Sequence, residues 1–185
     1  AAVVVVQVAA HLEGLHHHNV YFSEDYVEEF RQLFDERRVP EDPTVYVNVP
    51  SRSDGTVAPE GGEAVFVMIN APATGEPWDA SQLAEARGRI FARLHASGFP
   101  AIEQDVVVEH AVTPQMLGER FGMPGGAIYG GHSHGWRKAF FRPANKVKGY
   151  AGLYSVGGSA HPGGGTPMVL LSAKITEELI ARYEE

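Results

Sequence analysis

Cysteine is absent from this 185-residue sequence, and its absence excludes several classes of protein. A disulfide scaffold, a zinc site with thiolate ligands and a cysteine nucleophile all require residues that the chain lacks. No apolar run reaches the ~18 residues that a transmembrane helix needs. The N-terminus has neither the basic region nor the cleavage-site pattern of a secretory signal. A chain without cysteine is compatible with the cytosol, and we expect a cytoplasmic protein.

Two glycine fingerprints of nucleotide-binding proteins are also missing. The chain contains neither G-x-G-x-x-G nor G-x-x-x-x-G-K-[ST], so it cannot form a complete nucleotide site by itself. Its net charge of −8 argues against nucleic acid as a partner, because the phosphate backbone would be repelled. The chain begins with Ala1, inside a predicted strand, and we expect it to start partway through a longer polypeptide.

Apolar residues make up 44% of the sequence, which is enough for a globular core. Apolar periodicity, caps and breakers alternate along the chain in the order strand, helix, two strands, helix, strand, helix, irregular segment, strand, helix. This order predicts an α+β (mixed α/β) fold with a largely antiparallel sheet and flanking helices. The predicted strands are 2–10, 44–49, 64–70, 105–112 and 153–157, with 11–18 as a loop.

Four helices are predicted from their start signals. Ser23 is a candidate N-cap, and Asp79 with Gln82 forms a capping-box pattern. Thr113 and Thr166 each precede a proline, which is typical of a helix N-terminus. We expect the first two helices to bury these apolar faces: Tyr26, Val27, Phe30, Leu33 and Phe34 in one, and Leu83, Ala86, Ile90 and Leu94 in the other.

Residues 122–150 are rich in glycine and aromatic residues and have no clear period. This stretch is the best candidate for a boundary, with residues 1–121 before it and 151–185 after it. The C-terminal piece, a predicted strand, loop and helix, is too short to bury a core of its own. We therefore expect it to pack on something that lies outside this chain.

The loop at the start of the last helix, "GGSAHPGGGTPMVLLSAK" (157–174), holds five of its glycines within nine residues. A glycine-rich turn into a helix lets a ligand approach the backbone, and the free N–H groups favour negative charge. Composition alone leaves a structural turn and a ligand-binding loop equally open.

The longer run "GLYSVGGSAHPGGGTPMVLLSAK" (152–174) resembles the C-terminal flavin-binding signature of the carotenoid desaturases, the phytoene dehydrogenase-type members of the FAD-dependent amine-oxidase-like superfamily. Segments 17–34, 40–61 and 125–145 also look like parts of that family, so the resemblance covers nearly the whole chain. "GGAIYGGHSHGW" (125–136) is similar to the hydroxycarotenoid desaturase branch.

The resemblance implies that this chain is the C-terminal portion of an enzyme that desaturates a carotenoid precursor by hydride transfer to FAD. Residues 1–121 would belong to the substrate-binding domain, and 151–185 would complete a Rossmann-like FAD domain. Because the N-terminal FAD-binding segment is not in the sequence, we expect the chain alone to be inactive. No residue stands out as a catalytic base. The residues that match the flavin-facing motif are Gly157, Gly158, His161, Pro162, Gly163, Gly165, Thr166, Pro167 and Met168.

An aromatic and basic segment, "GWRKAFFRP" (135–143), follows His134. Its Trp136, Phe140 and Phe141 suit contact with an apolar polyene substrate or a peripheral membrane anchor. Ordinary packing against the flavin domain is the competing interpretation. We also expect the isolated chain to self-associate through its exposed flavin-facing surface.

Three other kinds of functional site have weaker support in the sequence. Histidines 16–18 and the pair His132 and His134 lack partners at metal-ligand spacing, so no metal site is predicted. Ser133 lacks a nucleophile motif and a third orienting group. The acidic residues Glu24, Asp25, Glu28 and Glu29 are interpreted as a solvated helix face. Two alternative functions stay open: a stand-alone module that binds an apolar ligand, and a flavin-dependent polyene isomerase or saturase.

Overall fold

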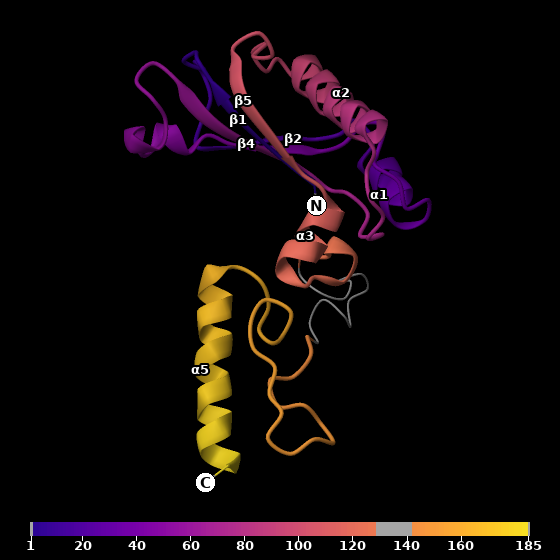
Figure 1. Ribbon diagram of the computed structural model, residues 1–185, viewed down its shortest axis with the longest axis vertical. Helices are drawn as coiled ribbons and strands as arrows, with labels where there is room; N and C mark the ends of the chain where they lie inside the picture. Colours follow the sequence, from indigo (N-terminus) through magenta and orange to yellow (C-terminus); the bar gives the residue numbers. More distant parts are fainter. Residues whose placement is uncertain (1, 129–141, 185) are drawn as a thin grey trace. The chain divides into compact units, whose positions relative to one another are not determined.

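A computed structural model describes residues 2–128 and 142–184, apart from the side chains of residues 2–5. The chain divides into two compact units, Ala1–Gly126 and Ala127–Glu185 (Figure 1). The division falls inside the glycine-rich stretch 122–150. The assignment of 1–121 and 151–185 to a substrate domain and a flavin domain stays a prediction.

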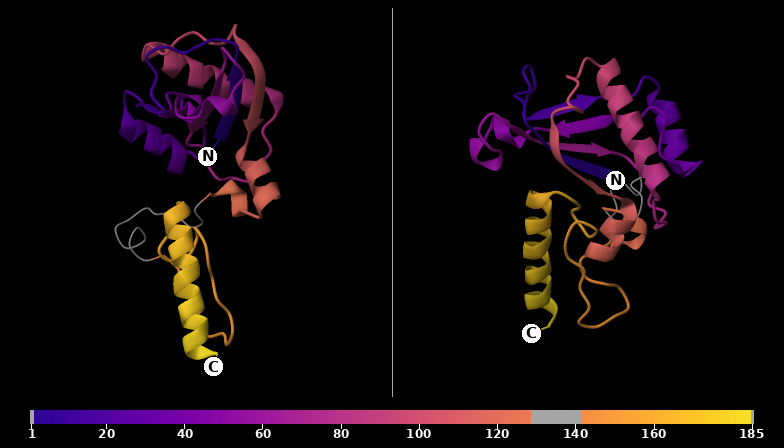
Figure 2. Two further views of the ribbon diagram at one scale, coloured as in Figure 1. Left: turned by 90° about the vertical axis from the view of Figure 1, so that its left-hand side faces the viewer. Right: turned by 45° about the horizontal axis from the view of Figure 1, so that its top comes forward.

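The first unit is built on a five-stranded sheet in the order β2-β3-β4-β1-β5 (Figures 1 and 2). All neighbouring strands are antiparallel, which confirms the expected mixed α/β fold with an antiparallel sheet. β3 and β4, which lie within or close to the predicted strands 44–49 and 64–70, pair with each other. The strands are β1 (Ala2–Val8), β2 (His18–Tyr21), β3 (Val45–Asn48), β4 (Glu63–Ile69) and β5 (Val106–Val112).

Strand β2 was missing from the sequence prediction, which treated residues 11–18 as a loop. It is only four residues long and forms the edge of the sheet, where its register is set by pairing with β3. A short edge strand has little hydrophobic periodicity of its own. The structure therefore corrects the assignment of His18, which begins a strand.

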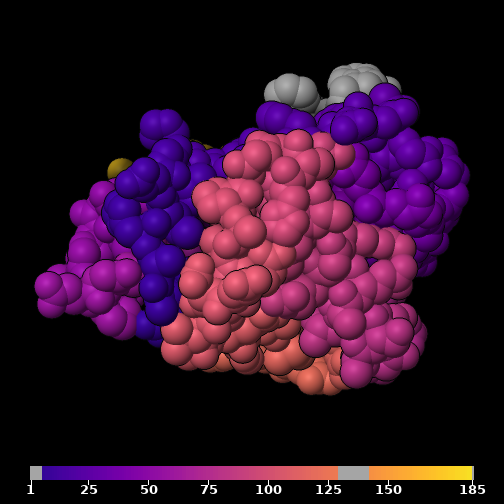
Figure 3. All heavy atoms as spheres, turned by 90° about the horizontal axis from the view of Figure 1, so that it is seen from above, coloured from indigo at the N-terminus to yellow at the C-terminus, as the bar shows by residue number. Residues whose placement is uncertain are grey.

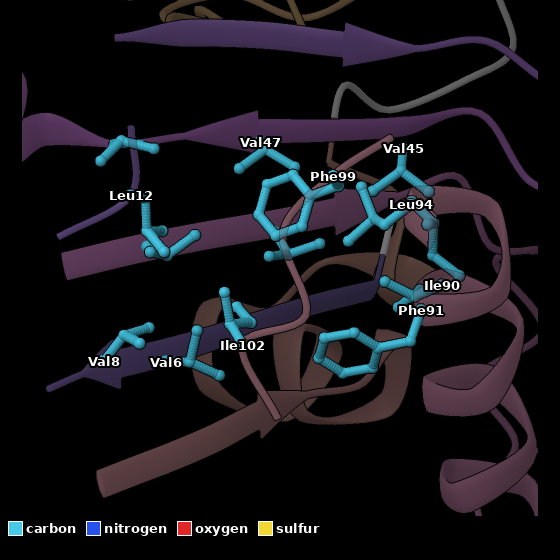
Figure 4. Close-up of a cluster of buried hydrophobic side chains, with 14 residues drawn as sticks. Val6, Val8, Leu12, Val45, Val47, Ile90, Phe91, Leu94, Phe99 and Ile102 are labelled. Atoms are coloured by element: carbon cyan, nitrogen blue, oxygen red, sulfur yellow. The ribbon is translucent and has the colours of Figure 1, made fainter. Parts of the chain in front are cut away.

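Helix α2 (Ala80–Ala96) covers one face of the sheet, and its capping box between Asp79 and Gln82 is present as predicted. Figure 4 shows Ile90 and Leu94 among the valine side chains of the strands beneath. The pink segments around residues 80–112 occupy the centre of the surface in Figure 3. The buried core is therefore the layer between α2 and the inward side chains of the sheet.

Helix α1 (Tyr26–Phe34) begins two residues later than predicted, because its N-cap is Asp25 rather than Ser23. The predicted buried face is correct at Leu33, which is 5% exposed, but wrong at Tyr26 and Val27, which are 50% and 81% exposed. The rings of Tyr26, Phe30 and Phe34 follow one another along the helix at 4.7 and 5.5 Å. The inward residues are Glu29, Gln32 and Leu33.

Glu29 corrects the interpretation of the acidic cluster as a wholly solvated face, since it is only 1% exposed. Its Oε2 accepts hydrogen bonds from the hydroxyls of Ser23 at 2.9 Å and Thr44 at 2.6 Å. A buried carboxylate needs such partners, because desolvation without them costs several kcal/mol. The two hydroxyls come from outside the helix, so the helical pattern could not reveal them.

A second buried carboxylate, Glu63, lies at the start of β4 and is 2% exposed. Ser51 donates to it, and its Oε1 lies 2.9 Å from His11 and 3.1 Å from Arg52. Burial by itself raises the pKa of Glu63, but the hydrogen bonds from Ser51 and Arg52 outweigh it and lower the pKa. The charged form is thus stabilised by folding.

We expect Arg52→Ala to make the first unit more sensitive to acid. A lowered pKa stabilises the fold above the ordinary value of 4.5 and loses that contribution as pH falls through the folded pKa. Without Arg52, less opposes the effect of burial, so the pKa of Glu63 rises and acid unfolding begins at a higher pH. Circular dichroism against pH measures the midpoint. Arg31→Ala, which breaks exposed pairs with Glu28 and Glu36, is the control and should move the midpoint less; equal shifts would contradict the prediction.

Three short 3₁₀ turns and a third helix complete the first unit. Helix α3 (Pro114–Phe121) begins at the predicted Thr113 cap, whose hydroxyl accepts from the Met116 N–H. It ends at Gly122 in the left-handed conformation, which glycine adopts readily. The 3₁₀ turns are η1 (Pro50–Arg52), η2 (Gly55–Val57) and η3 (Pro124–Gly126).

Within residues 142–184, the second unit contains a long loop followed by helix α5 (Thr166–Tyr183). The predicted strand at 153–157 is wrong, because within residues 142–184 only a single bridge pairs Lys146 with Tyr154. A β pattern without a neighbouring strand cannot form a ladder. The N-cap of α5 is Gly165 rather than Thr166, which is already the first helical residue. The C-terminal piece is therefore loop and helix.

Candidate functional site

The glycine-rich loop runs into the N-terminus of α5 with a backbone that only glycine adopts readily. Gly157, Gly163 and Gly165 have φ angles of 109°, 133° and 98°. A Cβ atom added at Gly157 or Gly165 would meet no heavy atom within 4 Å. The backbone at these two positions is therefore open to the close approach of a ligand.

The two glycine runs also pack against each other. A Cβ atom at Gly158 would lie 3.5 Å from Cα of Gly164 and 3.8 Å from Cγ2 of Val169. These are ordinary van der Waals distances, so the loop is already in contact with itself and with the first turn of α5. The predicted flavin-facing residues therefore lie in one continuous loop and helix end.

The N-terminus of α5 is not capped by a side chain. The Val169 N–H donates to the Gly165 carbonyl at 2.9 Å and closes the first turn. Thr166 and Met168 are exposed residues of this first turn, and their N–H groups have no acceptor within the helix, whereas Pro167 has no N–H. These N–H groups and the positive end of the helix dipole favour a negatively charged or polar group.

Two of the predicted residues have N–H groups that are already engaged. The Gly157 N–H donates to Ser172 Oγ at 3.1 Å, and the His161 N–H donates to the Pro143 carbonyl at 2.9 Å. The His161 side chain is exposed, while Gly163 is buried. For all nine predicted residues a role in cofactor binding stays a prediction. Gly157 and His161 would therefore shape the loop, and their N–H groups would not be available to donate to a cofactor.

Sequence reasoning missed two residues that support this loop, Asn145 and Ser172. They are 3% and 0% exposed and are hydrogen-bonded to each other at 3.0 Å. A serine inside the apolar run 168–173 was the only available signal. Nothing in the sequence around Asn145 indicates that its amide contacts residues more than ten positions away.

The far end of α5 is tied to the loop by a tyrosine and a lysine. Tyr154 Oη donates to Glu184 Oε1 at 2.7 Å, and Lys146 Nζ lies 3.6 Å from the centre of the Tyr183 ring. Burial, together with the hydrogen bond to Glu184, raises the pKa of Tyr154 to about 12. Tyr154 therefore stays protonated at neutral pH and acts as a donor in this contact.

In the first unit, the sheet face opposite α2 is half-buried and carries apolar residues beside polar ones, since Asn48 and His18 pair in line with Phe66. Side chains alternate along β4, so that Phe66 and Met68 lie on this face while Val65 and Val67 are in the core. The strand register places Tyr46 beside Met68 and Val20 beside Tyr46. Val20 is 49% exposed. A row of apolar side chains that crosses three strands suits an elongated apolar ligand.

Several predicted residues lie outside the described residues: His134, Trp136, Phe140 and Phe141, and with them His132 and Ser133. Their contact with a substrate or a membrane stays a prediction. Of the other histidines, His17 Nδ1 lies 2.7 Å from Ser53 Oγ and His18 Nδ1 lies 2.8 Å from Tyr46 Oη. Within 2–128 and 142–184, no helix is both long and apolar enough to cross a bilayer.

The loop and the start of α5 fit the polar edge of a flavin. They offer open backbone at Gly157 and Gly165, N–H groups without an acceptor in the helix at Thr166 and Met168, and a positive helix end without a competing carboxylate cap. A dinucleotide also needs a phosphate-binding turn, and the sequence contains no such fingerprint.

Comparison with known proteins identifies relatives of this chain, although no family model matches it. It is 42% identical over 164 residues to a 1-hydroxycarotenoid 3,4-desaturase of Flavobacterium sp. (strain P99-3), covering 88% of this chain and 33% of that protein. It is 39% identical over 169 residues to a zeta-carotene-forming phytoene desaturase of Myxococcus xanthus, covering 90% and 32%.

A 4,4'-diaponeurosporene oxygenase of Staphylococcus haemolyticus (strain JCSC1435) is 33% identical over 171 residues, or 92% of this chain and 34% of that protein. The chain thus spans about a third of the length of the curated relatives that it matches. The resemblance to the carotenoid desaturases is confirmed: over the part of these proteins that it matches, this chain belongs to that family.

Proposed function

We propose that this chain is the C-terminal part of a longer FAD-dependent enzyme that desaturates a carotenoid precursor. The observation that carries the proposal is the match to two desaturases over 88% and 90% of the chain. A second observation supports it: the chain contains a glycine loop whose open backbone suits a cofactor. When bound, FAD would supply the acceptor for the hydride removed from the substrate.

In this proposal the two units have different tasks. The loop from Gly157 to Gly165 and the first turn of α5 hold the polar edge of the flavin with backbone N–H groups. The sheet face around Phe66 and Met68 holds the apolar substrate. Polyene chains have few polar atoms, so an apolar wall can orient them by shape and exclude water.

Phosphate binding would come from a part of the polypeptide that is not in this sequence, and residues 151–185 would complete its Rossmann-like domain. The exposed apolar side chains of α5 support this, since Leu170 is 67% and Leu171 42% exposed. Patches of this kind mark surfaces that are covered in the complete protein. We therefore expect the 185-residue chain alone to self-associate and to show no turnover.

The printed names of two relatives support a substrate class. The 42% relative is named for a 1-hydroxycarotenoid, and a relative of Rubrivivax gelatinosus at 36% is named hydroxyneurosporene desaturase. We propose a hydroxylated linear carotenoid as the preferred substrate. Relatives named as oxygenases are 32–33% identical, so the products must distinguish desaturation from oxygenation.

The test uses the natural polypeptide that contains this chain, purified and supplied with FAD. We expect it to retain flavin and to convert a hydroxylated carotenoid into a product that is two hydrogens lighter, measured by mass spectrometry. Phytoene serves as the comparison substrate. A product heavier by oxygen would favour an oxygenase, and an isomer of unchanged mass would favour an isomerase. A protein that holds carotenoid but neither flavin nor activity would favour a binding module.

Phe66→Glu is expected to reduce desaturation at least about tenfold while leaving the fold intact. The side chain is half-buried on the proposed substrate face, so a charge there remains hydrated without substrate but must be desolvated when a polyene binds. The effect should appear mainly in KM. Val57→Glu is the matched control, because Val57 is 46% exposed in η2, outside the sheet. Equal losses in both variants would contradict the assignment of this face.

A further inference from the structure

Asn145 is a buried side chain that bridges the two ends of the loop formed by residues 155–161. Its Nδ2 lies 3.1 Å from the carbonyl oxygen of Ser155 and 3.0 Å from that of His161. The Ser155 N–H donates in return to the Asn145 carbonyl at 2.7 Å. One residue therefore holds the first and last residues of the loop that contains Gly157.

The orientation of this amide is set by its partners. Both main-chain partners are carbonyl oxygens, which only accept hydrogen bonds, so the nitrogen and not the oxygen must face them. An aspartate has the same shape, but its carboxylate oxygens would face the oxygens of Ser155 and His161. The contact is therefore specific for asparagine at position 145.

Ser172 joins this loop to α5. It is fully buried, and its Oγ accepts from Asn145 Nδ2 at 3.0 Å and from the Gly157 N–H at 3.1 Å. The Gly157 N–H thus has a fixed partner in a backbone conformation, φ 109°, that is otherwise only one of several open to glycine. Loss of Ser172 Oγ would leave the half-buried Gly157 N–H without its acceptor, whereas Asn145 Nδ2 would keep the carbonyl oxygens of Ser155 and His161.

We propose that Asn145 and Ser172 are positioning residues that hold the glycine loop in its ligand-binding conformation. They contact the loop and not the ligand, so their effect on binding is indirect. By ordering residues 155–161 before a ligand arrives, they reduce the entropy that binding would otherwise lose. The inference rests on the proposed function for the identity of the ligand, FAD. The hydrogen bonds of Asn145 and Ser172 to the loop, which we call the clamp, can be tested without that ligand.

The first experiment measures amide hydrogen exchange in the 185-residue chain for wild type, Asn145→Asp and Ser172→Ala. We expect exchange at Gly157 and His161 to accelerate roughly tenfold or more in both variants, because each loses a buried hydrogen bond. The amides in the last turns of α5 should keep their protection. If Asn145→Asp does not fold, as judged by circular dichroism, Ser172→Ala decides the test, because it removes one hydroxyl and introduces no charge.

Asn19→Asp is the matched control. Asn19 Nδ2 also donates to two carbonyl oxygens, those of His16 at 2.7 Å and Val47 at 3.3 Å, but it lies in the first unit. It should leave exchange at Gly157 unchanged. Unchanged exchange in Asn145→Asp and Ser172→Ala, or equal acceleration in Asn19→Asp, would overturn the clamp.

The second experiment measures FAD affinity in the natural polypeptide, from the change in flavin fluorescence on binding. We expect affinity to fall roughly tenfold in Asn145→Asp and Ser172→Ala and to be unchanged in Asn19→Asp. Faster exchange with unchanged affinity would overturn the positioning role while the proposed function stands. A wild-type protein that binds no FAD would instead overturn the proposed function, and the exchange data would still decide the clamp.

Discussion

Leu94→Ala is expected to lower the free energy of unfolding of the first unit by about 3 kcal/mol. The side chain of Leu94 is fully buried between α2 and the sheet, where it belongs to the main core cluster. Its truncation loses the transfer free energy of the removed methyl groups and leaves a cavity that close-packed neighbours cannot fill. Urea denaturation followed by circular dichroism measures the loss.

Leu170→Ala is the control for this prediction, because it removes the same atoms from a side chain that is 67% exposed. It should change stability by no more than about 0.5 kcal/mol. If the two variants were equally stable, α2 could not be packed on the sheet as described. A changed dependence on urea concentration, rather than a changed midpoint, would indicate an altered unfolded state.

Gly157→Val should weaken FAD binding by the natural polypeptide roughly tenfold to a hundredfold. A valine at φ 109° is strained, and its side chain would project into the open space beside the loop. The strain shifts the loop away from the conformation that presents the start of α5. Flavin retained after gel filtration, with the fluorescence titration described above, measures the effect.

Gly98→Val separates backbone strain from ligand binding. Gly98 also has a positive φ, of 79°, and a Cβ there would also meet nothing within 4 Å, but it follows α2 in the first unit. It should lower stability without lowering FAD affinity. Retention of full affinity by Gly157→Val would show that the loop is only a structural turn, the interpretation that composition alone left open.

Local patterns predicted the parts of the fold whose stability is local. The capping box at Asp79 and the Thr113 cap before Pro114 were correct, because their hydrogen bonds join residues three positions apart. The strands predicted at 44–49 and 64–70 were also correct, since both are short runs rich in apolar residues. The family was identified from the loop at 152–174, where the glycines meet strict conformational requirements.

The errors have a common origin in contacts between distant residues. The buried face of α1 was wrong because Thr44, fifteen residues away from Glu29, supplies a hydroxyl that makes burial of this carboxylate tolerable. The strand at 153–157 was wrong because no neighbouring strand is present for it within the described residues. The apolar pattern of α1 allowed more than one buried face, and the pattern at 153–157 allowed either a strand or a loop.

The amino-acid sequence by itself determined the family, the antiparallel α/β class and the position of the glycine loop, because glycine conformation, capping and strand alternation are local properties. Tertiary structure alone decided which carboxylates are buried and which residues hold the loop. Asn145 and Ser172 are 27 positions apart, and only folding brings the amide and the hydroxyl to 3.0 Å. Hydrogen bonds in a buried site depend on such proximity, which no periodicity in the sequence encodes.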